Sequence, residues 1–305
     1  MLLRGRTGFP IILYGLYLVY LGLSFRGSAK ALRPFVDRSH VSVWRWVERF
    51  PGFRRILSAR CRVFIFLVDE TAVMERIVTG VRGLDTILKG GLPKGSVTAV
   101  IGPPGAGKTT LGMQFLLTGI LLGRDSAYVL TFAPATLKVI AEGFGWNPTF
   151  IEKIEILDLF SKYSNASSRY EHTADIYSLT DINLALGRML DEVTSENNMR
   201  LVIDSMSDII TLQKDEAALN SFLRIVKSKL QAKGVTSLVL VEEGVHELKT
   251  MSFVESVCDG TIKLKKEDDD RLLTVSRMLA TPTPPGWRKL TTSTGIEIIS
   301  DEFFC

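Results

Sequence analysis

Residues 102–110, with the sequence GPPGAGKTT, constrain this chain more than any other stretch. They satisfy the pattern G-x-x-x-x-G-K-[ST], in which glycines let the backbone curl so that successive N–H groups point at an anion. The apolar residues 96–101 before the loop indicate a buried strand, and the apolar residues 111–117 after it indicate a helix. This order of strand, glycine loop and helix predicts a phosphate-binding P-loop.

The side chains of the loop suggest which ligand it binds. Lys108 is a mobile cation that can reach the β- and γ-phosphates of a nucleotide, and the hydroxyl of Thr109 can bind Mg²⁺. The helix that begins near Lys108 adds the positive end of its dipole. We therefore predict ATP and Mg²⁺ as ligands, with these nucleotide-binding residues: Gly102, Pro103, Pro104, Gly105, Ala106, Gly107, Lys108, Thr109 and Thr110.

Charge divides the chain into two parts. Residues 1–73 contain 12 Lys and Arg against 4 Asp and Glu, whereas residues 74–305 contain 25 against 29. We expect a basic helical segment over 1–73 and a separate nucleotide-binding domain over 74–305. The net charge of −4 on the second part argues against a broad DNA-binding face there, so any DNA binding is expected from the first part.

Residues 7–25 contain no charged side chain, and this stretch approaches the length that spans a bilayer. Pro10 and three glycines interrupt it, which favours a buried helical segment over a membrane span. The three cysteines are scattered and form no C-x-x-C motif, so we expect no zinc site, no disulfide framework and a reducing compartment. We therefore expect a cytoplasmic protein, with a membrane anchor through residues 7–25 as the alternative.

Two short helices are predicted in the basic segment, over residues 23–32 and 39–50. Together they are similar to a helix-turn-helix, and a plain helical hairpin with solvated arginines is the alternative. Residues 10–72 resemble the N-terminal part of DDE insertion-sequence transposases, which would make Asp69 the first catalytic aspartate. No second Asp or Glu of such a site follows, so we expect a fused fragment without transposition. Met74 is a natural start for the second part.

From Met74 onward the chain resembles KaiC-like ATPases of the RecA superfamily. The resemblance runs over residues 74–300 and rests on TGVRGLDTILKGGLPKGS at 79–96, the P-loop, and GFGW at 143–146. It also includes the apolar strand 200–204, which ends in Asp204 as in a Walker B motif, so that Asp204 can hold Mg²⁺ through water. The resemblance implies an α/β fold with a central mostly parallel sheet flanked by helices, and a homo-oligomer such as a hexameric ring.

Two departures from this family bear on hydrolysis. Members that hydrolyse ATP usually carry a Glu pair just after the second strand, where this chain has FAPAT at residues 132–136. Leu279 stands where the family often has a second basic residue reaching the γ-phosphate of a neighbouring subunit, which leaves Arg277 alone in that role. Glu242, at the end of a later predicted strand, is the remaining catalytic candidate beside Lys108, and a solvated strand end is the alternative reading.

These observations favour an ATP-binding regulatory or signalling module with weak or absent hydrolysis. An active ATPase of the RecA superfamily that acts on DNA is the first alternative, and a membrane-anchored nucleotide-binding protein is the second. The missing glutamates favour the module over the active ATPase, because water without an orienting acceptor is a poor nucleophile.

Overall fold

The computed structural model describes residues 16, 18, 19, 24–33, 39–49, 74–192 and 198–299. Contacts divide the chain into two compact units, Met1–Val73 and Met74–Cys305. Asp69 and most of the uncharged stretch 7–25 lie outside the described residues. In the part of the chain that is described, no helix has the length and apolar character that crossing a membrane requires.

The smaller unit contains two described helices, α2 (Phe25–Leu32) and α3 (His40–Arg49). Ser24 caps α2, because its Oγ accepts a hydrogen bond of 3.1 Å from the backbone N–H of Gly27. Leu32 and Val43 are fully buried and pack α2 against α3. Both helices lie within the two segments that the sequence predicts to be helical.

The larger unit is built on one sheet with the strand order β12-β11-β10-β9-β3-β8-β7-β4-β5-β6. The strands from β9 to β6 in this order are parallel, and β10 to β12 are antiparallel. The bounds are β3 (Val97–Gly102), β4 (Ser126–Leu130), β5 (Glu155–Asp158), β6 (His172–Thr173), β7 (Arg200–Asp204), β8 (Thr236–Glu242), β9 (Gly260–Glu267), β10 (Asp270–Met278), β11 (Arg288–Thr291) and β12 (Glu297–Ile298). The short strands β1 (Arg76–Ile77) and β2 (Leu92–Pro93) pair separately.

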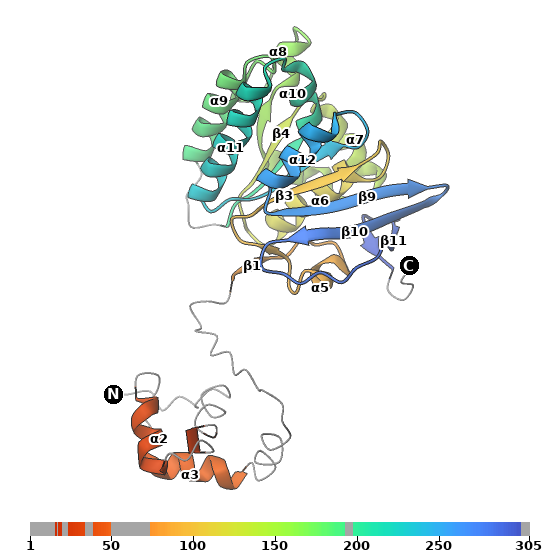
Figure 1. The fold of residues 1–305 in the computed structure, drawn as a ribbon. Helices are drawn as coiled ribbons and strands as arrows, with labels where there is room; N and C mark the ends of the chain where they lie inside the picture. The colour runs from red at the N-terminus through yellow and green to blue at the C-terminus, as the bar shows by residue number, and fades with distance from the viewer. Residues whose placement is uncertain are drawn as a thin grey trace. The chain divides into compact units, whose positions relative to one another are not determined.

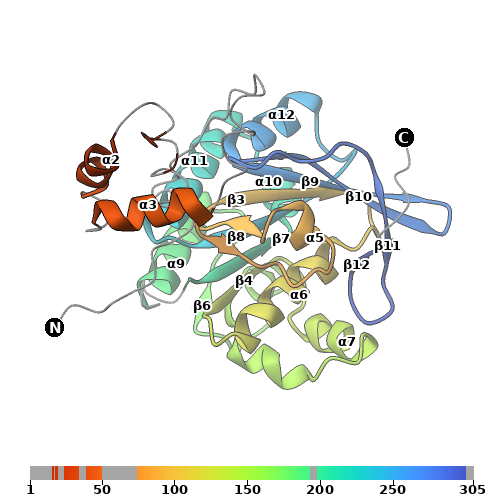
Figure 2. The ribbon, with the colours of Figure 1, turned by 90° about the horizontal axis from the view of Figure 1, so that it is seen from below.

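Helices cover both faces of this sheet (Figures 1 and 2). The helices α6 (Lys108–Leu121) and α7 (Ala135–Gly143) pack on one face. The other face carries α9 (Leu179–Glu192), α10 (Met206–Leu212), α11 (Glu216–Ala232) and α12 (Leu248–Val257). Shorter elements are α5 (Leu84–Ile87), the 3-10 helix η2 (Pro148–Lys153) and α8 (Phe160–Tyr163). This arrangement confirms the predicted α/β fold with a mostly parallel sheet between helices.

Alternation along the central strands fills the core on both sides. In β3, Val97, Ala99 and Ile101 join the apolar cluster beneath α9–α12, whereas Val100 joins the cluster beneath α6 and α7. All six residues of β3 are buried, which explains why the strand reads as a continuous apolar run rather than an alternating one. Because parallel strands end at the same edge, the residues that follow β3, β7 and β8 meet there.

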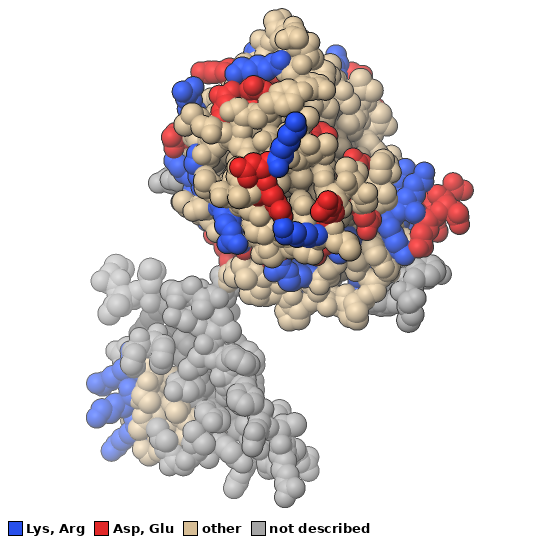
Figure 3. All heavy atoms as spheres, turned by 45° about the horizontal axis from the view of Figure 1, so that its top comes forward, with Lys and Arg blue, Asp and Glu red and all other residues tan. Residues whose placement is uncertain are grey.

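On the face of the larger unit drawn in Figure 3, acidic and basic side chains are interspersed. Many acidic and basic side chains of this unit form pairs, such as Lys263 with Glu255 at 3.0 Å and Lys289 with Asp270 at 2.6 Å. The acidic run at residues 267–270 forms the exposed turn between β9 and β10.

Candidate nucleotide-binding site

A pocket of about 390 Å³ opens at the carboxyl ends of β3, β7 and β8. The P-loop leaves β3 and enters α6 at Lys108, in the predicted order of strand, loop and helix. The pocket is lined by the following residues: Pro104, Gly105, Gly107, Lys108, Thr109, Thr110, Phe144, Asp204, Ser205, Glu242, Arg271 and Thr292. Most of the predicted site residues therefore meet in one place, although they come from three separate parts of the chain.

The glycines of the loop meet specific steric demands. Gly105 and Gly107 have φ values of 74° and 103°, in the left-handed region that favours glycine. A Cβ on Gly102 would lie 2.6 Å from the carbonyl oxygen of Leu264 on the neighbouring strand β9. Gly107 is also the N-cap of α6 and has no side chain to satisfy the first N–H groups of that helix. The start of the helix thus keeps its backbone donors for an anion.

Lys108 turns its ammonium towards the base of the loop. Its Nζ donates hydrogen bonds to the carbonyl oxygens of Gly102 at 2.7 Å and Pro103 at 2.9 Å. Oε1 of Glu242 lies 3.7 Å from the same nitrogen. Burial lowers the pKa of Lys108, and the negative charges of Glu242 and Asp204 oppose that shift. The lysine is therefore held inside the pocket as a cation surrounded by oxygen atoms.

Asp204 ends β7 and is 5% exposed. The phenol of Tyr128 donates a hydrogen bond of 3.0 Å to its Oδ2, and the hydroxyl of Thr109 forms another hydrogen bond with this carboxylate. Burial raises the pKa of Asp204, and these two hydrogen bonds together with Lys108 oppose that shift. A carboxylate beside a threonine hydroxyl provides the oxygen ligands that Mg²⁺ prefers, so the two predicted metal residues fit that ion.

Glu242 ends β8 directly beside Gly102, its register partner in β3. Its backbone N–H donates a hydrogen bond of 2.7 Å to Oγ of Ser207, which also contacts Nε2 of His246 at 2.8 Å. The carboxylate is about one-third exposed. The structure thus brings the two predicted catalytic candidates, Lys108 and Glu242, together at the pocket.

Three of the nine predicted loop residues do not line the pocket. Gly102 and Pro103 serve instead through their carbonyl groups, which hold the ammonium of Lys108. Ala106 is fully buried in the apolar cluster beneath α6. The remaining six predicted residues face the pocket.

The pocket also contains residues that no sequence motif assigned to the site. Arg271 on β10 donates from Nε to the carbonyl oxygen of Gly105 at 3.0 Å and from a terminal nitrogen to Oγ1 of Thr292 at 3.3 Å. Phe144, the C-cap of α7, stacks on Trp146 with ring centroids 5.2 Å apart. Phe144 belongs to the GFGW motif at 143–146, whereas Arg271 and Thr292 have no local sequence signal.

Gln114 of α6 holds the backbone of Ile296, just before β12. Its Nε2 donates to the carbonyl oxygens of Gly80 at 2.7 Å and Ile296 at 3.1 Å, and its Oε1 accepts from the backbone N–H of Ile296 at 2.7 Å. Nε1 of Trp146 donates to the carbonyl oxygen of Thr294 at 2.9 Å. The segment between β11 and β12, which contains the pocket residue Thr292, is therefore held by contacts from α6 and from the segment after α7.

The segment after β4, residues 132–136 with the sequence FAPAT, contains no carboxylate of its own. A carboxylate from another element, α10, lies next to the start of this segment. Thr131 hydrogen-bonds through its hydroxyl to Asp208 of α10. The same hydroxyl accepts a hydrogen bond of 2.9 Å from the backbone N–H of Ser205, next to Asp204. Sequence reasoning missed Asp208 because its approach to β4 depends on how α10 packs.

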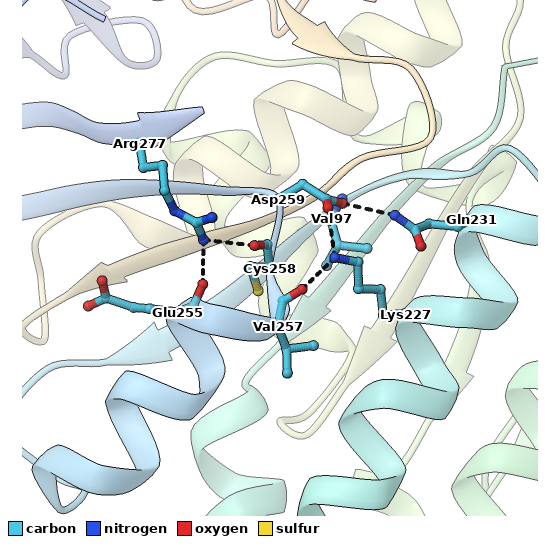
Figure 4. A network of polar contacts seen from close by, with 8 residues as sticks. All are labelled: Val97, Lys227, Gln231, Glu255, Val257, Cys258, Asp259 and Arg277. Atoms are coloured by element: carbon cyan, nitrogen blue, oxygen red, sulfur yellow. Dashed lines mark hydrogen bonds and ion pairs between the residues drawn. The ribbon is translucent and has the colours of Figure 1, made fainter. Parts of the chain in front are cut away.

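The family resemblance implies that Arg277 reaches the γ-phosphate of a neighbouring subunit. In this structure its guanidinium hydrogen-bonds to carbonyl groups of its own chain (Figure 4). Its guanidinium donates to the carbonyl oxygens of Glu255 and, at 2.8 Å, Cys258, at the C-terminal end of α12. Asp259 follows, and its carboxylate accepts a hydrogen bond of 2.7 Å from Lys227 of α11. Leu279, which stands where the family often has a second basic residue, is 46% exposed. Arg277 thus caps a helix end, where a cation also complements the helix dipole.

Comparison with known proteins identifies relatives for the larger unit. Residues 77–302 match the sequence model of the protein family described as ATPase: KaiC. A UPF0273 protein of Methanopyrus kandleri is 30% identical over 203 residues, covering 64% of this chain and 78% of the relative. The circadian clock protein KaiC2 of Synechocystis is 27% identical over 208 residues, which are 68% of this chain and 36% of that protein.

A solved structure shares the fold. The crystal structure of a KaiC-like protein from the hyperthermophile Pyrococcus horikoshii superposes with a TM-score of 0.62 and 24% sequence identity. The match covers 74% of this chain and 99% of that structure. None of these likenesses supports the transposase fragment that residues 10–72 were expected to contain.

Proposed function

This chain belongs to the KaiC ATPase family, and on that premise we propose that it binds ATP with Mg²⁺ and acts as a regulatory or signalling module with weak or absent hydrolysis. One observation carries the proposal: the P-loop lysine, Lys108, at the start of α6, and the carboxylate of Asp204, at the end of β7, converge on a single pocket. The expected working form is a homo-oligomer such as a hexameric ring.

The pocket supports distinct roles for its residues. The backbone N–H groups of the loop and Lys108 would hold the phosphates, because both supply positive charge to an anion. Thr109 and Asp204 would hold Mg²⁺, which when bound neutralises part of the phosphate charge. Phe144 and Arg271 present planar side chains on another wall, and such side chains stack well on a nucleotide base.

We expect weak hydrolysis because each carboxylate near the loop is either missing or already paired. Residues 132–136 contain none, and Asp208, which reaches that region, is hydrogen-bonded to Thr131. Glu242 is partly engaged by Lys108, since the two charged groups lie 3.7 Å apart. Assistance from a general base is worth about 10²–10⁴-fold in rate. We therefore propose that the ATP-bound ground state forms readily and that turnover is slow.

Calorimetric titration of the full chain with ATP and Mg²⁺ tests this proposal. Lys108→Ala should lose at least about 100-fold in affinity, because the loop loses its mobile cation. Lys153→Ala, which removes an exposed lysine that does not line the pocket, should leave the affinity unchanged. Equal affinity in the Lys108→Ala variant and the wild type would show that the nucleotide binds elsewhere.

A second candidate function, DNA binding, is favoured by one feature of the smaller unit. Arg26, Lys30 and Arg33 are all exposed and recur at helical spacing along α2. Such a row can contact a phosphate backbone, and binding would then weaken steeply with salt. Fluorescence anisotropy with duplex DNA between about 50 and 200 mM salt tests it, and the Arg26→Gln/Lys30→Gln/Arg33→Gln variant should lose that binding.

A further inference from the structure

A second pocket, with a volume of about 600 Å³, lies at the opposite end of α7 from the nucleotide pocket. The two pockets share no lining residue, but both touch α7: Lys138 of this helix lines the second, and its C-cap, Phe144, lines the first. The second pocket is the larger of the two, and its volume falls within the range typical of small-molecule sites. Nothing in the proposed nucleotide chemistry uses it.

Residues 167–170 form one wall of this pocket, and hydrogen bonds to a buried carboxylate hold that wall in place. Asp158, which ends β5, is fully buried, and its oxygens accept hydrogen bonds from Oγ of Ser168 at 2.7 Å and from the backbone N–H groups of Phe160 at 3.0 Å and Ser161 at 2.9 Å. Oγ of Ser168 in turn accepts from the backbone N–H of Tyr170 at 3.1 Å. The carboxylate of Asp158 is thus already hydrogen-bonded by residues around the pocket, and these hydrogen bonds hold the wall without a ligand.

Two cationic side chains, Lys138 and Arg169, supply hydrogen-bond donors to this pocket. The guanidinium of Arg169 lies 5.0 Å from the centre of the Tyr170 ring and donates a hydrogen bond of 2.9 Å to the phenol oxygen, which leaves the phenol hydrogen available. Lys138 lies 3.8 Å from Glu142, and its side chain is 67% exposed, so this pairing is weak. Glu152 is the one exposed carboxylate of the lining, and it offsets part of this positive charge.

The rest of the lining includes apolar surface that can contact a ring. Pro134 and Pro148 contribute rigid apolar faces, and Ile151, which lines the same pocket, belongs to the apolar core cluster. An apolar face beside two cations and a free phenol hydrogen matches a ligand with a flat ring and an anionic group. We propose that this pocket binds a small aromatic anion, with its ring against Pro134, Pro148 and Ile151 and its charge between Lys138 and Arg169.

Phenyl phosphate is a suitable probe, because it combines a ring with a compact anion. It is titrated calorimetrically into the full chain with saturating ATP and Mg²⁺, so that the P-loop is blocked, and the titration is repeated with the Lys108→Ala variant. Binding should persist in both cases. Loss of binding in Lys108→Ala would place the probe at the P-loop and overturn the proposal, whether or not ATP itself binds there.

A matched pair of double variants locates the site. Lys138→Gln/Arg169→Gln should weaken phenyl phosphate binding about tenfold or more, because it removes two charge-assisted contacts. Lys153→Gln/Arg188→Gln removes the same charge from exposed positions outside the pocket and should change nothing. Equal losses in both variants, or no binding by the wild type, would overturn the proposal.

Two partial probes test the ligand class. Inorganic phosphate carries only the anion, and benzyl alcohol carries only the ring with a neutral polar group. Each should bind about tenfold or more weakly than phenyl phosphate if the pocket uses both features. Inorganic phosphate that binds as tightly as phenyl phosphate would overturn the aromatic part of the proposal.

Discussion

The ammonium nitrogen of Lys108 lies 3.7 Å from Oε1 of Glu242, although the two residues are far apart in the sequence. Their meeting depends on the parallel pairing of β3 with β8, in which Gly102 is the register partner of Glu242. We propose that this carboxylate orients the attacking water, because it lines the same pocket as Lys108. It also gives Lys108 a partner that competes with the phosphates for its charge.

We predict that Glu242→Gln separates binding from hydrolysis. ATP affinity should rise a few-fold, because an anion near the phosphates is removed and Lys108 loses a competing partner. The residual single-turnover rate should fall by about 10²–10⁴-fold if Glu242 orients the attacking water. The two measurements are calorimetric titration and single-turnover hydrolysis by the same preparation, with Glu171→Gln, an exposed carboxylate that does not line the pocket, as the control.

Three results would contradict parts of this picture. An unchanged residual rate in Glu242→Gln would make Glu242 an ordinary solvated residue at the end of a strand. A rise in rate would mean that its pairing with Lys108 inhibits catalysis. A wild-type rate of about 1 s⁻¹ that is lost in Lys108→Ala would refute weak hydrolysis altogether.

Asp204→Asn should stabilise the protein at neutral pH when no nucleotide is present. Burial raises the pKa of Asp204, so the ionised carboxylate is disfavoured in the folded state. This cost is absent below the unfolded pKa and develops as the pH rises through the higher folded pKa. At pH 7 the melting temperature should rise by about 2–4 °C, which corresponds to about 1 kcal/mol in a domain of this size.

The pH dependence of that change is the decisive measurement. Scanning calorimetry should show the difference between Asp204→Asn and the wild type narrowing as the pH falls from 7 towards 4. Mg²⁺-dependent ATP affinity should be lower in the variant at pH 7, because an amide binds the cation more weakly than a carboxylate. A lower melting temperature at pH 7 would show that the contacts of Asp204 with Tyr128 and Thr109 outweigh its burial cost.

Arg277→Met tests the helix-capping role. The free energy of unfolding should fall by about 1 kcal/mol, because the carbonyl groups at the end of α12 lose a charged donor at a partly exposed site. ATP affinity should stay within about twofold of the wild type, since Arg277 does not line the pocket. Thermal unfolding and calorimetric titration measure the two effects, with the exposed Arg188→Met as control. Unchanged stability with reduced hydrolysis in an oligomer would instead assign Arg277 to a neighbouring active site.

Residues 74–305 should fold and bind ATP without residues 1–73. The described apolar residues of the smaller unit form a cluster of their own, separate from the two clusters that flank the sheet. The truncated protein should therefore unfold in a single cooperative transition and bind ATP within about twofold of the full chain. An insoluble or non-cooperative product would contradict this.

Liposome flotation by the full chain but not by the truncation would identify residues 7–25 as an anchor.

Sequence alone determined the local parts of the nucleotide site. Gly105 and Gly107 adopt left-handed backbone conformations that few other residues tolerate, so their spacing is visible without any structure. The strand before the loop and the strand that ends in Asp204 are both buried on two faces, which makes them continuous apolar runs. The fold class was predicted from the resemblance of residues 74–300 to KaiC-like ATPases, to which these local motifs contribute.

The tertiary structure alone decided which distant side chains complete the site. Arg271 reaches the P-loop because β10 pairs with β9, which in turn pairs with β3, and no local pattern encodes that order. Asp208 reaches Thr131 only through the packing of α10. The carbonyl groups that engage Arg277 likewise depend on where α12 ends. Local backbone demands leave a trace in the sequence, whereas contacts between elements depend on sheet order and packing, which distribute their cause over the whole chain.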